Sequence, residues 1–315
     1  MKFWKVILAV VLVVVLAGWP FVIENRFLTH IGTLICMFTL LAFSMNLMLR
    51  IGQLSLAHGA LMGIGAYTSA LMMMSLKLPF LLAFLLSGVA GGLVALVIGP
   101  ILLRIRGVYF VLLTFAFGEL VILTFTEWVD VFGGINGIFS VPRAQFFGYV
   151  IRDRATYYLI ALAMATGGYF LLRGLYRSEI GAVMDTLHDD EDLARSLGVN
   201  TMAYRLLVFT ISGAIAGFAG GFYASYFTFV TPQAFEFWTA VNMIVINVLG
   251  GIASPIGVIF GALILVPLPE MLRDAKQYQV LSYGLTLIVF LKFMPDGIYG
   301  IFGVLKKKLW RTRHV

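Results

Sequence analysis

The segment RSEIGAVMDTLHDDEDLARSLGVNTMAYRLLVF, residues 177–209, is the longest polar run in the chain and lies between long apolar segments. It holds six of the 15 acidic residues of a 315-residue chain that is 61% hydrophobic. Charged side chains and unpaired backbone groups are costly in hydrocarbon, so this segment cannot lie inside a bilayer. We therefore predict a loop on the membrane surface with membrane-spanning helices on either side.

The composition of the whole chain supports this prediction. The mean hydropathy is +0.99 and only 12% of the residues are charged, which excludes an ordinary soluble globular protein. Apolar runs near the roughly 20 residues needed to cross a bilayer recur along the length. Much of the net charge of +7 lies in basic clusters at the two ends, which are typical of cytoplasmic flanks and do not indicate nucleic-acid binding.

We thus predict an all-α, polytopic helical integral membrane protein with a single transmembrane domain over residues 1–315 and with both termini in the cytoplasm. About eight spans are expected, plus a re-entrant or broken helix over residues 240–268; nine or ten spans are the alternative. Residues 127–155 are expected to form an outer loop and residues 173–205 a cytoplasmic loop. The expected spans cover residues 6–23, 31–49, 51–74, 80–103, 107–126, 156–172, 206–229 and 280–301.

Two apolar segments are interrupted by small and polar residues, at 51–63 and at 250–261, and their sequences are weakly similar. Paired interrupted segments can line a translocation pathway with their free backbone groups, although close helix packing is the commoner explanation of such glycines. We take as pathway candidates Gln53, Ser55, His58, Asn247, Gly250, Gly251 and Ser254.

Glu119 lies inside the apolar run FAFGELVIL and is a further pathway candidate, because an ionisable residue inside a span usually has a function or a partner. The alternative is that it pairs with Arg104 or Arg106 and only holds helices together. In the span at 206–229, glycines at 213, 217 and 221 form two overlapping GxxxG patterns, which predict close helix packing.

Within the polar loop, the pattern predicts a short helix. Asp189 or Asp190 can cap its first turn, and Gly198 can end it. Leu193 and Leu197 lie four residues apart and therefore share one face. The spacing of Asp192, Ala194 and Gly198 resembles the coupling loop of ABC importer permeases, in which a short helix sits in a groove of the ATPase. A solvated interhelical loop is the alternative interpretation.

Five segments together resemble successive landmarks of one family, the branched-chain amino-acid ABC transporter permeases of the LivM type. They are GQLSLAHGALMGIGAYT at 52–68, RIRGVYFVLLTFAFGEL at 104–120, DDEDLARSLGVN at 189–200, ISGAIAGFAGGFYA at 211–224 and VLGGIASPIGVIFGA at 248–262. Urea and short-chain amide permeases share these landmarks. The chain departs from the usual Glu-Ala-Ala coupling pattern by having Asp192 and Leu193 in place of glutamate and alanine.

The resemblance implies an importer in the bacterial inner membrane that carries Leu, Ile or Val. It implies a second homologous permease, two ABC ATPase subunits and an outer solute-binding protein as partners. ATPase contacts would then involve Asp189, Asp190, Glu191, Asp192, Ala194, Leu197 and Gly198. The sequence has no G-x-x-x-x-G-K-[ST] phosphate loop, so ATP would be hydrolysed by a partner, and the chain would be neither an enzyme nor a cofactor-binding protein.

The four histidines and the single Cys36 are too scattered to predict a metal site. A different class of protein stays open at this point: an ion-coupled secondary transporter would use an intramembrane acid such as Glu119 and would need no ATP.

Overall fold

The computed structural model describes residues 25–272 apart from 147 and 148, together with single residues at 18, 278, 281, 284, 285, 288 and 292. The expected spans at 6–23 and 280–301 and the basic termini fall almost entirely outside the described residues.

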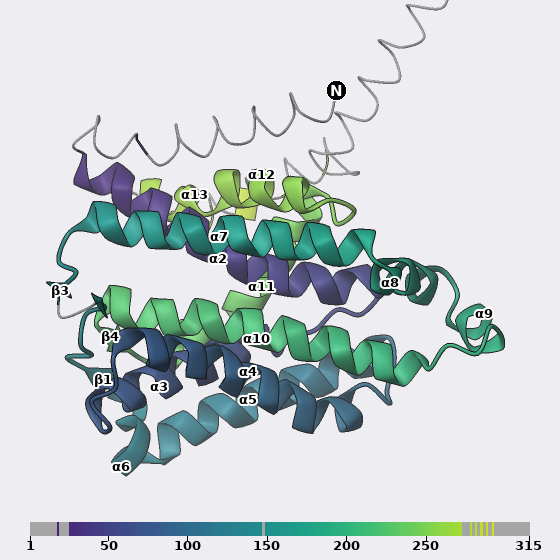
Figure 1. Cartoon of the computed structure of the whole chain (residues 1–315), viewed down its shortest axis with the longest axis horizontal. Coiled ribbons are helices and arrows are strands. Elements are labelled where there is room, and N and C mark those ends of the chain that lie inside the picture. The colour runs from purple at the N-terminus through teal and green to yellow at the C-terminus, as the bar shows by residue number, and fades with distance from the viewer. Residues whose placement is uncertain are drawn as a thin grey trace, which may run out of the picture.

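The described part is a bundle of helices that run along its long axis (Figure 1). Five of these helices are long and apolar enough to cross a membrane: α2 (Arg26–Arg50), α4 (Phe80–Leu102), α5 (Val108–Glu127), α7 (Arg154–Arg177) and α10 (Thr201–Phe227). They confirm the spans expected at 31–49, 80–103, 107–126, 156–172 and 206–229. The fold is therefore that of an all-α membrane protein.

Helix α10 lies at the centre of the bundle and packs against α4 and against α3 (His58–Met74). Its glycines permit this: a Cβ on Gly217 would overlap the carbonyl of Ser87 in α4, and a Cβ on Gly65 of α3 would overlap the backbone of Gly217. The close packing predicted from the GxxxG patterns is confirmed. Backbones can approach this closely only where no side chain separates them.

The two ends of the bundle carry different structures (Figure 1). At one end lie α8 (Glu179–Asp189) and α9 (Glu191–Ser196), and at the other lie α6 (Val129–Phe132) and the short strands. The polar loop between α7 and α10 covers 178–200, which is shorter than the expected 173–205, because both helices extend further than the apolar residues do.

Residues 128–153 contain structure that the sequence pattern did not predict. Besides α6 they form η1 (Gly134–Asn136), β1 (Ile138–Phe139), β2 (Gln145–Phe146) and β3 (Tyr149–Val150). β2 pairs with β3, and β1 pairs antiparallel with β4 (Phe229–Val230) directly after α10. The Tyr157 hydroxyl accepts from the Ala144 amide and donates to the Ser225 carbonyl, both at 3.0 Å, so this loop is fixed to α7 and α10.

The segment expected at 240–268 is broken. η2 (Pro232–Phe235) leads into α11 (Phe237–Gly250), which is followed by α12 (Pro255–Leu265) and α13 (Pro267–Met271). The two halves are bent by 117° at the gap between Gly250 and Pro255. α11 and α12 pack against each other through Gly250, Gly257 and Gly261, which lie in backbone-to-backbone contact.

Candidate functional site

The first interrupted segment, residues 51–57, is irregular and enters α3 at His58. Gly52 has φ +73°, a left-handed conformation that favours glycine. Next to it, Gln53 is buried, at 4% exposure, and neither its side-chain oxygen nor its nitrogen has a hydrogen-bond partner within the described residues. Buried amides are almost always satisfied, so a bare one here indicates a position where a ligand or water completes the site.

Ser55 and His58 are fully buried in the same region, and each has a polar contact with the protein, although Nδ1 of His58 has no hydrogen-bond partner within the described residues. The Ser55 hydroxyl accepts from the Ala57 amide at 3.3 Å. His58 Nε2 lies 2.6 Å from the Ser212 hydroxyl of α10, which in turn donates to the Ser44 carbonyl of α2 at 2.8 Å. This chain ties the start of α3 to α10 and α2.

The second interrupted segment is closed by hydrogen bonds. Asn247 is fully buried, and its Nδ2 donates to the Ala42 carbonyl at 3.0 Å and to the Met243 carbonyl at 2.8 Å. Ser254 caps α12 by accepting from the Ile256 amide at 3.3 Å. Gly251 has φ +98° and turns the chain out of α11.

Candidates from both segments are connected to α2 by hydrogen bonds. His58 reaches the carbonyl of residue 44 through Ser212, and Asn247 bonds to the carbonyl of residue 42. Residues next to both interruptions are therefore linked to the same short stretch of α2, at residues 42–44.

Glu119 is exposed on α5, among exposed apolar side chains such as Phe115, Leu120 and Leu123. The alternative in which it pairs with Arg104 or Arg106 is wrong, since no ion pair joins them among the described residues, and Arg106 bonds to Glu191 instead. The reason is distance along the helix: Glu119 lies 11 residues after Val108, the first residue of α5, which is about 16 Å at 1.5 Å per residue.

Helix α8 is the main feature of the polar loop that the sequence reasoning missed. Asp185 accepts from Arg50 Nε at 2.8 Å and from Arg50 Nη2 at 2.9 Å. On the same helix, His188 lies against Gly52, where an added Cβ would come within 3.3 Å of its Nδ1. α8 therefore touches the end of α2 and the first interrupted segment at once.

The short helix expected around 189–198 is confirmed as α9. Asp190 is its N-cap, accepting from the amides of Asp192 and Leu193 at 2.9 and 3.0 Å, and Gly198 follows it with φ +82°. Asp192, Leu193 and Leu197 are exposed, as are Asp189 and Gly198. They give α9 an outward face that carries both apolar and acidic groups.

Two of the expected contact residues of this loop point inward. Ala194 is fully buried, and Glu191 is 9% exposed. Glu191 accepts from Arg106 Nη2 at 2.7 Å and from Arg195 Nη2 at 3.0 Å, and it also pairs with Arg205 of α10. Glu191 therefore anchors α9 to the bundle at the α4–α5 turn and at the start of α10.

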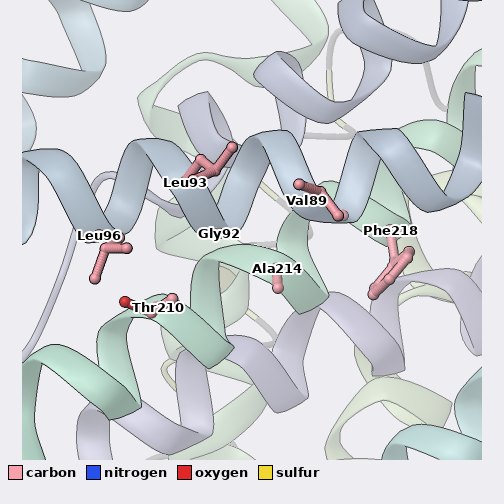
Figure 2. A pocket seen from close by; sticks show the side chains of 8 residues that line it. Val89, Gly92, Leu93, Leu96, Thr210, Ala214 and Phe218 are labelled. Atoms are coloured by element: carbon pink, nitrogen blue, oxygen red, sulfur yellow. The ribbon is translucent and has the colours of Figure 1, made fainter.

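A shallow groove lies between α4 and α10, and Figure 2 shows Val89, Leu93 and Phe218 on its walls. The one polar side chain in its lining, Thr210, donates its hydroxyl to the Leu206 carbonyl at 2.8 Å. The described lining of the groove is therefore apolar apart from this hydroxyl, whose proton is already donated to the backbone.

The residues that the sequence reasoning did not select are Asn46, Arg50, Tyr176 and Asp185. A signal was present for Asn46, which is a polar residue well inside the span at 31–49. For Arg50 and Asp185 no local signal exists, because the two residues are 135 positions apart.

The long apolar helices, the broken helix and the polar end define a polytopic helical membrane protein. The sequence model of the family described as "Branched-chain amino acid transport system / permease component" matches residues 27–294, so the chain belongs to this family. No solved structure gives a significant match to the chain.

Individual relatives agree with the family. The chain is 32% identical to the high-affinity branched-chain amino acid transport system permease protein LivM of Escherichia coli, over 92% of this chain and 73% of that protein. It is 29% identical to LivH of the same organism, over 79% and 86% of the two chains. A probable LivM of Methanocaldococcus jannaschii is 24% identical, over 69% and 67%. The family favours the transport-subunit interpretation over the ion-coupled alternative.

Proposed function

We propose that this chain is one transmembrane subunit of an ATP-driven importer that moves branched-chain amino acids across a bacterial inner membrane. The observation that carries the proposal is family membership over residues 27–294, together with relatives that are named for branched-chain amino acid transport. The chain itself contributes no ATPase site and needs no cofactor; ATP is hydrolysed by partner subunits.

The partners in this proposal are a second homologous permease, two ABC ATPases and an outer solute-binding protein. The pairing of two permeases is supported by the similarity of this one chain to both LivM and LivH of one organism. The end of the bundle with α8 and α9 would face the cytoplasm, and residues 128–153 would face the binding protein.

For the topology we propose eight spans with α11 and α12 as a re-entrant hairpin and with both termini in the cytoplasm. The 117° bend and the glycine contacts between α11 and α12 support a hairpin. Such a hairpin exposes backbone groups inside the membrane, which is tolerated only where protein or a water-filled pathway surrounds them.

Gln53 is the residue best placed to bind the substrate. A branched aliphatic amino acid needs an apolar wall and a few polar groups for its charged ends. The side-chain amide of Gln53 is buried and has no hydrogen-bond partner within the described residues, so it can supply such a group. Ser55, His58, Asn247, Gly250, Gly251 and Ser254 shape the surrounding frame. Glu119 would face the pathway or the second permease, because an exposed carboxylate against lipid is costly.

We assign ATPase binding to the outward face of α9, where the side chains of Leu193 and Leu197 are 51% and 70% exposed. The test is recovery of partner subunits from detergent-solubilised native membranes with tagged wild type and with a Leu193→Asp/Leu197→Asp variant. The variant should lose the ATPase and retain the second permease. Ile135→Asp is the matched control, because Ile135 is 66% exposed at the opposite end of the bundle.

Recovery of no ATPase with the folded wild-type protein would contradict the importer proposal as a whole. Equal ATPase recovery with the double variant and with wild type would contradict only the assignment to α9.

A further inference from the structure

A chain of polar contacts connects α8 to the gap between α11 and α12. It begins with the two-pronged ion pair between Arg50 and Asp185, at 2.8 and 2.9 Å. The guanidinium and carboxylate meet in the planar, bidentate arrangement that gives charged hydrogen bonds the most strength and direction. The remaining arm of Arg50, Nη1, reaches the Ala253 carbonyl in the gap at 3.5 Å.

Tyr176 holds Arg50 from the side. The guanidinium carbon lies 4.0 Å from the centre of the Tyr176 ring, within the range of cation–π attraction. The Tyr176 hydroxyl donates to Asn46 Oδ1 at 2.6 Å. The last turn of α7, which leads directly into α8, is thereby joined to the interior of α2.

Asn46 completes the connection. Its Nδ2 donates to Asn247 Oδ1 at 2.8 Å and to the Ile252 carbonyl at 3.1 Å. Two successive carbonyls in the gap, those of Ile252 and Ala253, are therefore each held by a side chain of α2. Residues 251–254 are not helical and lack the regular backbone hydrogen bonds of a helix. The contacts of the Ile252 and Ala253 carbonyls are therefore important for the backbone conformation of the gap.

We propose that Arg50, Asn46 and Tyr176 are positioning residues that couple movement of α8 to the conformation of the gap at residues 251–254. This inference rests on the proposed function, in which α8 belongs to the loop that meets the ATPase. When α8 shifts, Asp185 draws Arg50 with it, because separating the pair would leave the Arg50 charge, only 18% exposed, without its partner. The Ala253 carbonyl then loses or gains its donor, and the turn at Gly251 acts as the hinge.

The test measures how readily a thiol placed in the gap at residue 253 reacts. Cys36 is the only cysteine of the chain, so a Cys36→Ala/Ala253→Cys protein carries one thiol at an exposed position of the gap. The complex with its native ATPases and second permease is reconstituted in liposomes. The rate of labelling by a membrane-permeant maleimide is measured without nucleotide and after trapping with ATP and vanadate.

We expect trapping to change this rate by about fivefold, at the lower end of typical coupling between sites. Asp185→Asn and Arg50→Gln should abolish the change while ATPase recovery stays at the level of the parent protein. Asp185→Glu, which keeps the charge, should restore most of it. A merely structural ion pair would not give this pattern, since Asp185 is half exposed and its loss need not unfold α8.

Arg173→Gln is the matched control. Arg173 also contacts a tyrosine, with Nη1 3.2 Å from the Tyr169 hydroxyl, but its side chain is exposed and this contact stays within α7. The change in labelling rate on trapping should be the same in the Arg173→Gln variant as in the parent Cys36→Ala/Ala253→Cys protein. An unchanged response in Asp185→Asn, or no response to trapping in the parent complex, would overturn the coupling role. Failure to recover any ATPase with the parent would overturn the proposed function instead.

Discussion

The two interrupted segments have similar glycine-rich sequences but opposite hydrogen-bonding states. The first, at 51–57, leaves the buried amide of Gln53 without a partner among the residues that the structure describes. Beside and within the second, at 251–254, Asn247 and Ser254 are hydrogen-bonded. The glycines differ as well, since Gly52 faces the side chain of His188 and Gly250 faces backbone. The difference teaches that similar glycine-rich sequences can leave a buried amide available for a ligand in one place and hold the backbone by side chains in another, which is the contrast that the proposed binding and coupling roles use.

The largest expected effect on stability comes from a substitution at Gly250, directly before the second interrupted segment. Gly250→Ala places a Cβ onto the backbone of Gly257, which cannot move aside without separating α11 from α12. We expect a loss of about 3 kcal/mol, the upper range for overpacking, measured as thermal unfolding in detergent. Gly167→Ala in α7, where an added Cβ has open space, should not destabilise the protein. Equal behaviour of the two variants would contradict the close contact.

The next largest effect on stability is expected at Asn247, whose side-chain amide is hydrogen-bonded to the backbone. Asn247→Ala removes the donor of two backbone carbonyls and leaves Asn46 with one partner fewer. We expect a loss of about 2 kcal/mol, because buried polar groups are left unpaired. Asn136→Ala, at an exposed position of η1, serves as the control and should change stability by less than about 0.5 kcal/mol. A neutral Asn247→Ala would mean that the network does not hold the gap.

A smaller effect is expected at Gly52. Gly52→Ala must adopt φ +73° but meets only the His188 side chain at 3.3 Å, which can shift. The expected loss of about 1 kcal/mol comes from the backbone conformation alone. His188→Ala in the same protein should leave this loss unchanged if the cause is the backbone, and should remove it if the cause is crowding against α8.

The smallest change in stability, with the most informative change in activity, is expected for Gln53→Met. Replacing an unpaired buried amide by an apolar side chain of similar size should leave stability unchanged or raise it by about 1 kcal/mol. Uptake of labelled leucine by reconstituted complex should fall about tenfold, the equivalent of one lost hydrogen bond to a charged group. A clear loss of stability with normal uptake would identify Gln53 as a structural residue and remove the contrast between the two segments.

Much of the fold could be predicted from local patterns. Apolar runs located five described spans within a few residues, and Asp190 and Gly198 marked both ends of α9. These features depend on neighbours in the sequence: hydrocarbon burial on run length, and capping on residues within one turn. α8 was missed because its apolar face, with Met184 and Leu187 buried, lies within a stretch whose acids dominate the composition.

The candidate site was predicted less well. Glu191 was predicted to contact the ATPase because it lies in the segment that resembles a coupling loop, yet its side chain turns inward toward Arg106 and Arg205. His58 begins α3 and Asn247 lies within α11, three residues before its end, but the sequence could not tell a hydrogen-bonded polar residue from an unpaired one. That property depends on which groups of distant helices come within hydrogen-bonding distance.

The sequence by itself determined that this is a helical membrane protein, where five of its spans lie, and that the glycines at 213, 217 and 221 allow close helix packing. These outcomes follow from the cost of placing polar groups in hydrocarbon and from the absence of side chains at the contacts. Only the tertiary structure decided that the Gln53 amide has no hydrogen-bond partner within the described residues and that Glu191 holds α9 against the bundle. The same is true of the link from Asp185 through Arg50 to the gap. Each of these depends on pairing between residues far apart in the chain, which is fixed only when all the helices pack at once.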